Sequence, residues 1–137
     1  MIWVSERLWS PELLVPTRPS VYNSIVGQEI RSMVVGDMMV TVKSREVQRG
    51  MLAETGSRPD EARKHFLAAA HLELVLANDY ERAGDVELAR RSRISAASCF
   101  WRAGEVGRAH SIFEEERQSD PSGSDEIQDL INELKGE

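Results

Sequence analysis

The sequence predicts an all-α fold, built of antiparallel helical hairpins stacked in a short array and preceded by an N-terminal arm. Two observations support this prediction. The stretch from Arg58 to Gly84 is consistent with one long helix that carries apolar side chains on more than one face, as expected for a helix covered by neighbours on at least two sides. Four glycines, at positions 36, 56, 84 and 104, are separated by 20, 28 and 20 residues. Each interval fits one helix and one tight turn, and such regular units usually stack in an array.

The length and composition of the chain limit its class. Its 137 residues suit one domain with a substantial core, and its net charge of -6 argues against a general nucleic-acid binder, which needs a clustered basic surface. No apolar run approaches the roughly 20 residues of a membrane span, and the start lacks the basic flank of a signal peptide. The single cysteine, Cys99, excludes an intrachain disulfide and favours a reducing compartment. We therefore expect a cytoplasmic protein, and the 14 arginines against 3 lysines hint at a GC-rich bacterial genome.

Residues 1–19 are expected to form an extended arm ahead of a helical domain that spans residues 20–137. The arm contains three prolines, too many helix breakers for one helix, while Trp3 and Trp9 are too apolar to remain free in water. A short array has two open ends, and the polar last helix can cover only one of them. We expect the arm to cover the other end, either within the chain or by exchange in a homodimer.

Residues 20–42 allow two interpretations. The spacing of the apolar residues from Tyr22 to Val34 is helical. The same stretch is rich in β-branched residues, so it could instead form a pair of strands that turn at Gly36 and Asp37. We favour a helix, and we expect Gly36 and Asp37 to separate it from the next one.

From Gly36 onward the turn residues predict where the helices begin and end. A glycine supplies the left-handed backbone position that ends one helix, and the acidic residue after it suits the start of the next, as at Gly84-Asp85. Pro59 fits the first turn of the long helix, because the N–H that proline lacks would have no helical partner there. The expected helices span residues 37–55, 59–82, 86–102, 106–118 and 124–134.

The last complete hairpin carries a recurrent pattern of small, aromatic and turn-forming residues. These residues are Ala97, Phe100, Gly104, Ala109, Phe113 and Pro121. Their order resembles the tetratricopeptide repeat (TPR), a helical hairpin of about 34 residues. A poorer copy runs through Gly50, Ala53, Gly56, Ala62, Phe66 and Ala69, with its turn glycine displaced and its second helix too long. The resemblance is good over residues 86–121, fair over 37–82 and absent over 1–36, as in a divergent TPR-like protein.

The TPR resemblance implies a binding groove lined by the first helix of each pair. In TPR proteins this groove holds an extended peptide or a helix of the partner. The positions that the resemblance assigns to partner binding are Met51, Arg91, Ile94, Ser98, Trp101 and Arg102. Two guanidinium groups beside Ile94 and Trp101 imply a partner segment that carries both apolar and acidic residues.

A cluster of five arginines also allows two interpretations. Its members are Arg90, Arg91, Arg93, Arg102 and Arg108. They can form a solvated face that pairs with the acidic residues of neighbouring helices, which we favour. They can instead form a docking site for an acidic peptide or for RNA, because guanidinium groups bind carboxylates and phosphates bidentately.

The sequence offers no candidate catalytic, cofactor or metal site. His65 and His71 are six residues apart on one helix and so point about 240° apart, whereas two metal ligands on a helix are usually four residues apart. Nothing near Cys99 in the sequence would activate its thiol. We therefore expect a non-enzymatic protein-protein interaction module, a scaffold or adaptor. The alternative is a small helical regulator that binds nucleic acid or a small ligand.

Overall fold

The computed structural model describes the backbone of residues 21–136 and the side chains from Gly36 to Gly136. The arm expected over residues 1–19, with its predicted role in a homodimer, lies outside the described residues. The chain divides after Val35 into two units. The packing and the sites discussed below all belong to the second unit.

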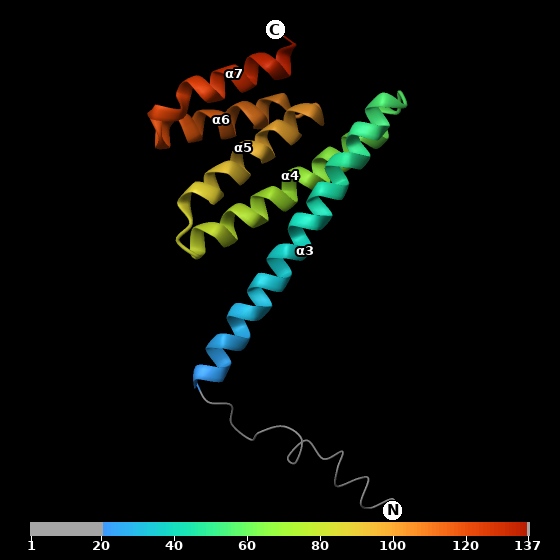
Figure 1. Ribbon diagram of the computed structural model, residues 1–137. Coiled ribbons are helices and arrows are strands. Elements are labelled where there is room, and N and C mark those ends of the chain that lie inside the picture. The colour runs from blue at the N-terminus through green and yellow to red at the C-terminus, as the bar shows by residue number, and fades with distance from the viewer. Residues whose placement is uncertain (1–20, 137) are drawn as a thin grey trace, which may run out of the picture. The chain divides into compact units, whose positions relative to one another are not determined.

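Five α-helices and one short 3₁₀ helix follow one another along the described chain (Figure 1). They are α3 (Val21–Thr55), α4 (Pro59–Arg82), α5 (Val86–Arg102), α6 (Val106–Ser119), η1 (Pro121–Gly123) and α7 (Ser124–Lys135). No strand occurs between residues 21 and 136. The all-α prediction is therefore confirmed, and the alternative of two strands before residue 42 is wrong.

Helix α3 is one element where the sequence predicted two. Gly36 and Asp37 were expected to open a new helix, but α3 continues through both of them and ends at Thr55. Gly36 does not have the positive φ of a helix-ending glycine. A glycine inside a helix costs only about 1 kcal/mol relative to alanine, so it does not by itself end the helix.

Glycine ends two of the helices as the sequence predicted. Gly84 after α4 and Gly104 after α5 have φ values of 82° and 87°, in the left-handed region that glycine adopts without steric cost. The turn between α3 and α4 differs from the prediction. Ser57, not Gly56, occupies the left-handed region there, with φ at 57°.

Residues at the helix starts stabilise the unpaired N–H groups and the positive end of the helix dipole. Pro59 stands in the first turn of α4. Asp85 caps α5, because its Oδ1 accepts a hydrogen bond of 3.1 Å from the backbone N–H of Leu88. In α7, Asp125 and Glu126 lie in the first turn, where carboxylates interact favourably with the dipole.

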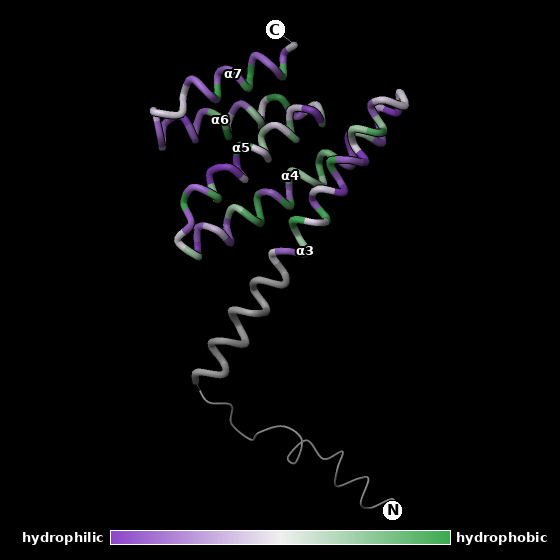
Figure 2. The backbone as a smooth tube through the Cα atoms, in the orientation of Figure 1, coloured by the Kyte–Doolittle hydropathy of each residue, from purple (hydrophilic) through white to green (hydrophobic). Residues whose placement is uncertain are grey.

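Helices α4 and α5 form the central antiparallel pair of the second unit. Ion pairs join Glu81 of α4 to Arg93 of α5, and Arg63 of α4 to Glu105, the residue before α6. Helix α6 returns along α5, and α7 follows it after η1 (Figure 1). The amphipathic character of these helices is visible along the chain, where apolar and polar stretches alternate (Figure 2).

The core combines a few large side chains with many alanines. The largest fully buried side chains are Phe66, Phe100, Phe113 and Ile127. Buried alanines on the facing helices are Ala62, Ala69, Ala70, Ala96, Ala97 and Ala109. Alanine lets two helix backbones approach closely, and each phenylalanine then fills the space that remains. Cys99 is also buried.

Candidate functional site

The second unit contains a groove with a volume of about 660 Å³. This volume lies within the about 300–1,000 Å³ typical of ligand pockets. Helix α3 contributes Lys43, Val47 and Glu54, α4 contributes Glu73, α5 contributes Ser95, Ser98, Cys99, Trp101 and Arg102, and α7 contributes Leu130, Glu133 and Leu134. Most of the lining therefore comes from α3, α5 and α7, which alternate along the chain with α4 and α6.

A buried ion pair forms part of the groove lining. Lys43 Nζ lies 3.0 Å from Glu73 Oε1, and the Glu73 side chain is only 5% exposed. A carboxylate removed from water to this degree is retained only with a compensating charge, which Lys43 supplies. The pair links α3 to α4, so the groove and the packing of these two helices depend on the same contact.

The pKa of the Cys99 thiol, which lies beside this ion pair, is raised above its ordinary value. Burial, with a smaller contribution from the negative charge of Glu73, raises the pKa of Cys99 to about 11. The nearby charges of Arg102 and Lys43 act in the opposite direction but contribute less. Because the thiolate is the nucleophilic form, Cys99 acts as a small packing side chain in this groove.

Apolar side chains form the other part of the lining. Val47, Leu130 and Leu134 are half-buried and pack against the core while they also line the groove. Trp101 lines it as well, and its ring meets the His110 ring edge-on at a centroid distance of 5.0 Å. An aromatic ring held by a neighbour in this way offers a large contact area that is already ordered.

The structure brings together three of the six residues that the sequence assigned to partner binding. Ser98, Trp101 and Arg102 all line the groove. Ile94 is half-buried and packs against the core. Met51 is exposed but does not contribute to the groove lining, although its helix neighbour Val47 does.

Arg91 also lies away from the groove lining. Its side chain is 72% exposed, and its Nε lies 3.5 Å from Oε1 of Glu87, one turn earlier on the same helix. Arg102, in contrast, stacks its guanidinium carbon 5.1 Å from the centroid of the Phe66 ring. The two arginines that the sequence assigned to one patch therefore have different surroundings.

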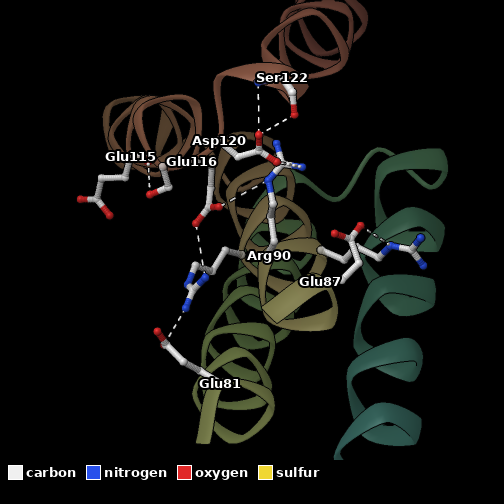
Figure 3. Close-up of polar contacts among 10 residues, drawn as sticks. Glu81, Glu87, Arg90, Glu115, Glu116, Asp120 and Ser122 are labelled. Carbon is white, nitrogen blue, oxygen red and sulfur yellow. Dashed lines mark hydrogen bonds and ion pairs between the residues drawn. The ribbon is translucent and has the colours of Figure 1, made fainter. Parts of the chain in front are cut away.

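Two other arginines of the cluster pair with acidic residues of neighbouring elements. Arg93 bridges Glu81 of α4 at 2.7 Å and Glu116 of α6 at 3.6 Å. Arg90 lies 3.8 Å from the same Glu116 and 3.4 Å from Asp120, just before η1 (Figure 3). For these two residues the structure agrees with the interpretation as partners of neighbouring acids.

The carboxylate between these two arginines is nearly buried. Burial raises the pKa of Glu116, and this effect exceeds the opposite effect of the charges on Arg93 and Arg90. The space above Arg90 is also restricted, because a Cβ at Gly123 would collide with the Arg90 guanidinium group. This network joins α4, α5, α6 and η1 and has a structural role.

The groove residues that were not assigned to the site from the sequence include Lys43, Glu73, Ser95, Cys99, Leu130, Glu133 and Leu134. One signal was present for the ion pair. Glu73 falls on the apolar face of the long helix, and a carboxylate in such a place needs a cationic partner from another helix. The contribution of α7 has no signal in the sequence, since it depends on how the last helix packs.

The three histidines make separate contacts. His65 Nδ1 lies 2.6 Å from Glu46 Oε2, and the His71 ring meets the Phe100 ring edge-on at 5.4 Å. His110 packs against Trp101 as described above. Among the side chains of residues 36–136, no three of His, Cys, Asp or Glu are grouped as metal ligands. None of the helices in the described part of the chain has the length and apolar character to cross a bilayer.

Comparison with known proteins adds no relative. No family model, no curated protein and no solved structure gives a significant match to the chain.

Proposed function

We propose that the protein is a non-catalytic interaction module, a TPR-like scaffold or adaptor, which binds an extended segment or a helix of a partner protein in the groove between α3, α5 and α7. The observation that carries this proposal is the composition of the groove lining. Val47, Trp101, Leu130 and Leu134 offer apolar contact at the surface, next to charged groups that can orient a partner.

The order of the helices around the groove supports the TPR-like interpretation. The groove receives most of its lining from every second helix, while α6 contributes none of it and α4 contributes only Glu73. An array of hairpins presents such a surface, because the first helix of each pair faces one side and the second helix faces the other. Trp101 and Arg102 are also of the residue types that most often dominate interface energetics.

The arginine network favours a protein partner over nucleic acid. Arg90 and Arg93 are engaged by Glu81, Glu116 and Asp120. Binding to phosphates requires free cations that can replace the counterions of the nucleic acid. Arginines already neutralised by carboxylates are poorly suited to that role.

The proposal can be tested with a random 12-residue peptide library displayed on phage and selected against the full chain. We expect selected peptides to bind the protein in solution, as measured by fluorescence anisotropy. Replacing the exposed Ser95 with tryptophan fills the groove from α5 without a change in the core. The variant Ser95→Trp should therefore weaken binding by about tenfold or more, which corresponds to about 1.4 kcal/mol.

Ser111→Trp is the matched control for this experiment. Ser111 is an exposed serine in the middle of α6, outside the groove lining, and its Oγ donates a hydrogen bond to the Gly107 carbonyl as serines commonly do within helices. This variant should bind the peptides as the wild type does. The proposal is overturned if no peptide is enriched, or if Ser95→Trp binds the selected peptides as tightly as Ser111→Trp does.

A further inference from the structure

The charges that line the groove are unequal in number. Glu54, Glu73 and Glu133 bring three carboxylates from three different helices, whereas Lys43 and Arg102 bring two cations. Lys43 and Glu73 neutralise each other across 3.0 Å. The charges of the lining that have no partner in this pair are the two carboxylates of Glu54 and Glu133 and the guanidinium group of Arg102.

Arg102 is oriented by an aromatic neighbour, because its guanidinium carbon lies 5.1 Å from the centroid of the Phe66 ring. Glu54, Glu133 and Arg102 are all exposed and form no ion pair with another described residue. The groove lining therefore offers a partner two unpaired carboxylates against one guanidinium group.

The position of Arg91 weakens the expectation that the partner segment is acidic. That expectation depended on two guanidinium groups in one patch, Arg91 and Arg102. Arg91 lies outside the groove lining and pairs with Glu87 on its own helix.

We infer that the groove binds a basic partner segment, in which apolar side chains contact Val47, Trp101, Leu130 and Leu134 while lysine or arginine side chains pair with Glu54 and Glu133. This inference rests on the proposed function and specifies the chemistry of the partner. The apolar contacts supply most of the affinity, and the two carboxylates supply selectivity and orientation.

The test uses the same 12-residue library and reads the composition of the selected peptides. Peptides selected by the wild-type protein should be enriched in lysine or arginine next to apolar residues. In solution at about 0.15 M salt, the double variant Glu54→Gln and Glu133→Gln should bind a selected basic peptide about fivefold more weakly, since two exposed carboxylates each contribute modestly. Replacing the cation of the peptide by norleucine should remove most of the difference between the two proteins.

The matched control is the double variant Glu115→Gln and Glu126→Gln. It changes the net charge of the protein by the same amount at two exposed positions outside the groove lining, so its affinity should remain at the wild-type value. The inference is overturned if the selected peptides are enriched in aspartate or glutamate, if they show no charge preference, or if the two double variants bind equally. In each of these cases, peptides that bind Ser95→Trp more weakly than Ser111→Trp would still support the proposed function. A failure of the inference about charge can therefore be distinguished from a failure of the proposed function.

Discussion

Gly50 of α3 lies directly against the ring of Phe66 in α4. A Cβ at position 50 would stand 2.9 Å from Cε2 and Cζ of that ring, and Phe66 itself is fully buried. The ring cannot move without disturbing Ala53, Ala62 and Ala103, which are buried in the same cluster. Glycine at position 50 is therefore required by the packing, although it weakens the helix.

Gly50→Ala should destabilise the protein. In an open helical position this change would stabilise by about 0.5–1 kcal/mol, but overpacking costs about 1–3 kcal/mol and should exceed that gain. The free energy of unfolding from urea titration measures the difference. Gly107→Ala in α6 is the control, because nothing described lies within 4 Å of a Cβ there. A decrease in the free energy of unfolding for Gly107→Ala, or an increase for Gly50→Ala, would contradict the packing argument.

Truncation of either central phenylalanine should cost about 3–5 kcal/mol. Phe66 and Phe100 are both 0% exposed, so Phe→Ala removes buried apolar area and leaves a cavity between helices that relax only partly. Val75→Ala provides the reference, since Val75 is 47% exposed and its truncation should stay within about 0.5 kcal/mol. Losses under about 1 kcal/mol at both phenylalanines would mean that the core is assigned to the wrong helix faces.

Truncation of the neighbouring residues Arg90 and Arg91 on α5 should have different effects on the stability of the protein. Arg90→Ala leaves Glu116 with Arg93 alone and removes a partner of Asp120, so we expect a loss of about 2–3 kcal/mol. Arg91→Ala removes only an exposed pair within one helix and should cost less than about 0.5 kcal/mol. Thermal unfolding of the two variants gives the comparison. Equal losses would show that the network around Glu116 does not stabilise the fold.

The raised pKa of Glu116 predicts a pH dependence of stability. Between the ordinary value of 4.5 and the raised value, the folded state holds a proton on Glu116 that the unfolded state has lost. The contribution of Glu116 to stability is therefore fully present below pH 4.5 and decreases as the pH rises through this window. The difference in unfolding free energy between the wild type and Glu116→Gln should decrease as the pH rises above 4.5, because the contributions of the other carboxylates are the same in both proteins. A difference that increases with pH would mean that Arg90 and Arg93 outweigh burial.

Local sequence signals predicted most of the helix boundaries. The ranges 59–82 and 86–102 agree with α4 and α5, because a proline, an aspartate cap and two left-handed glycines mark these ends by their own chemistry. The same signal was misleading at Gly36. Whether a glycine ends a helix depends on whether the chain turns there, and that is decided by tertiary packing.

The candidate site was less predictable than the helices. Arg91 and Arg102 are eleven residues apart, which brings them to the same side of an α-helix but about 16 Å apart along its axis. The helical periodicity of the sequence shows that two residues share a side of the helix, but it gives no indication of whether both lie at the same binding site. Only Arg102 stands where α3 and α7 complete the groove, and the positions of these helices depend on contacts such as that between Lys43 and Glu73.

The left-handed serine in the turn between α3 and α4 has a consequence for the groove. Ser57 has φ at 57°, a conformation that costs a side chain about 1 kcal/mol, and the glycine next to it does not use its own freedom. Ser57→Gly would relieve that strain, and the position is close to the groove, because the backbone N–H of Ser57 donates a hydrogen bond of 3.1 Å to the carbonyl of Glu54, a residue of the groove lining. The strained turn therefore helps to hold the end of α3 that presents Glu54 to the groove.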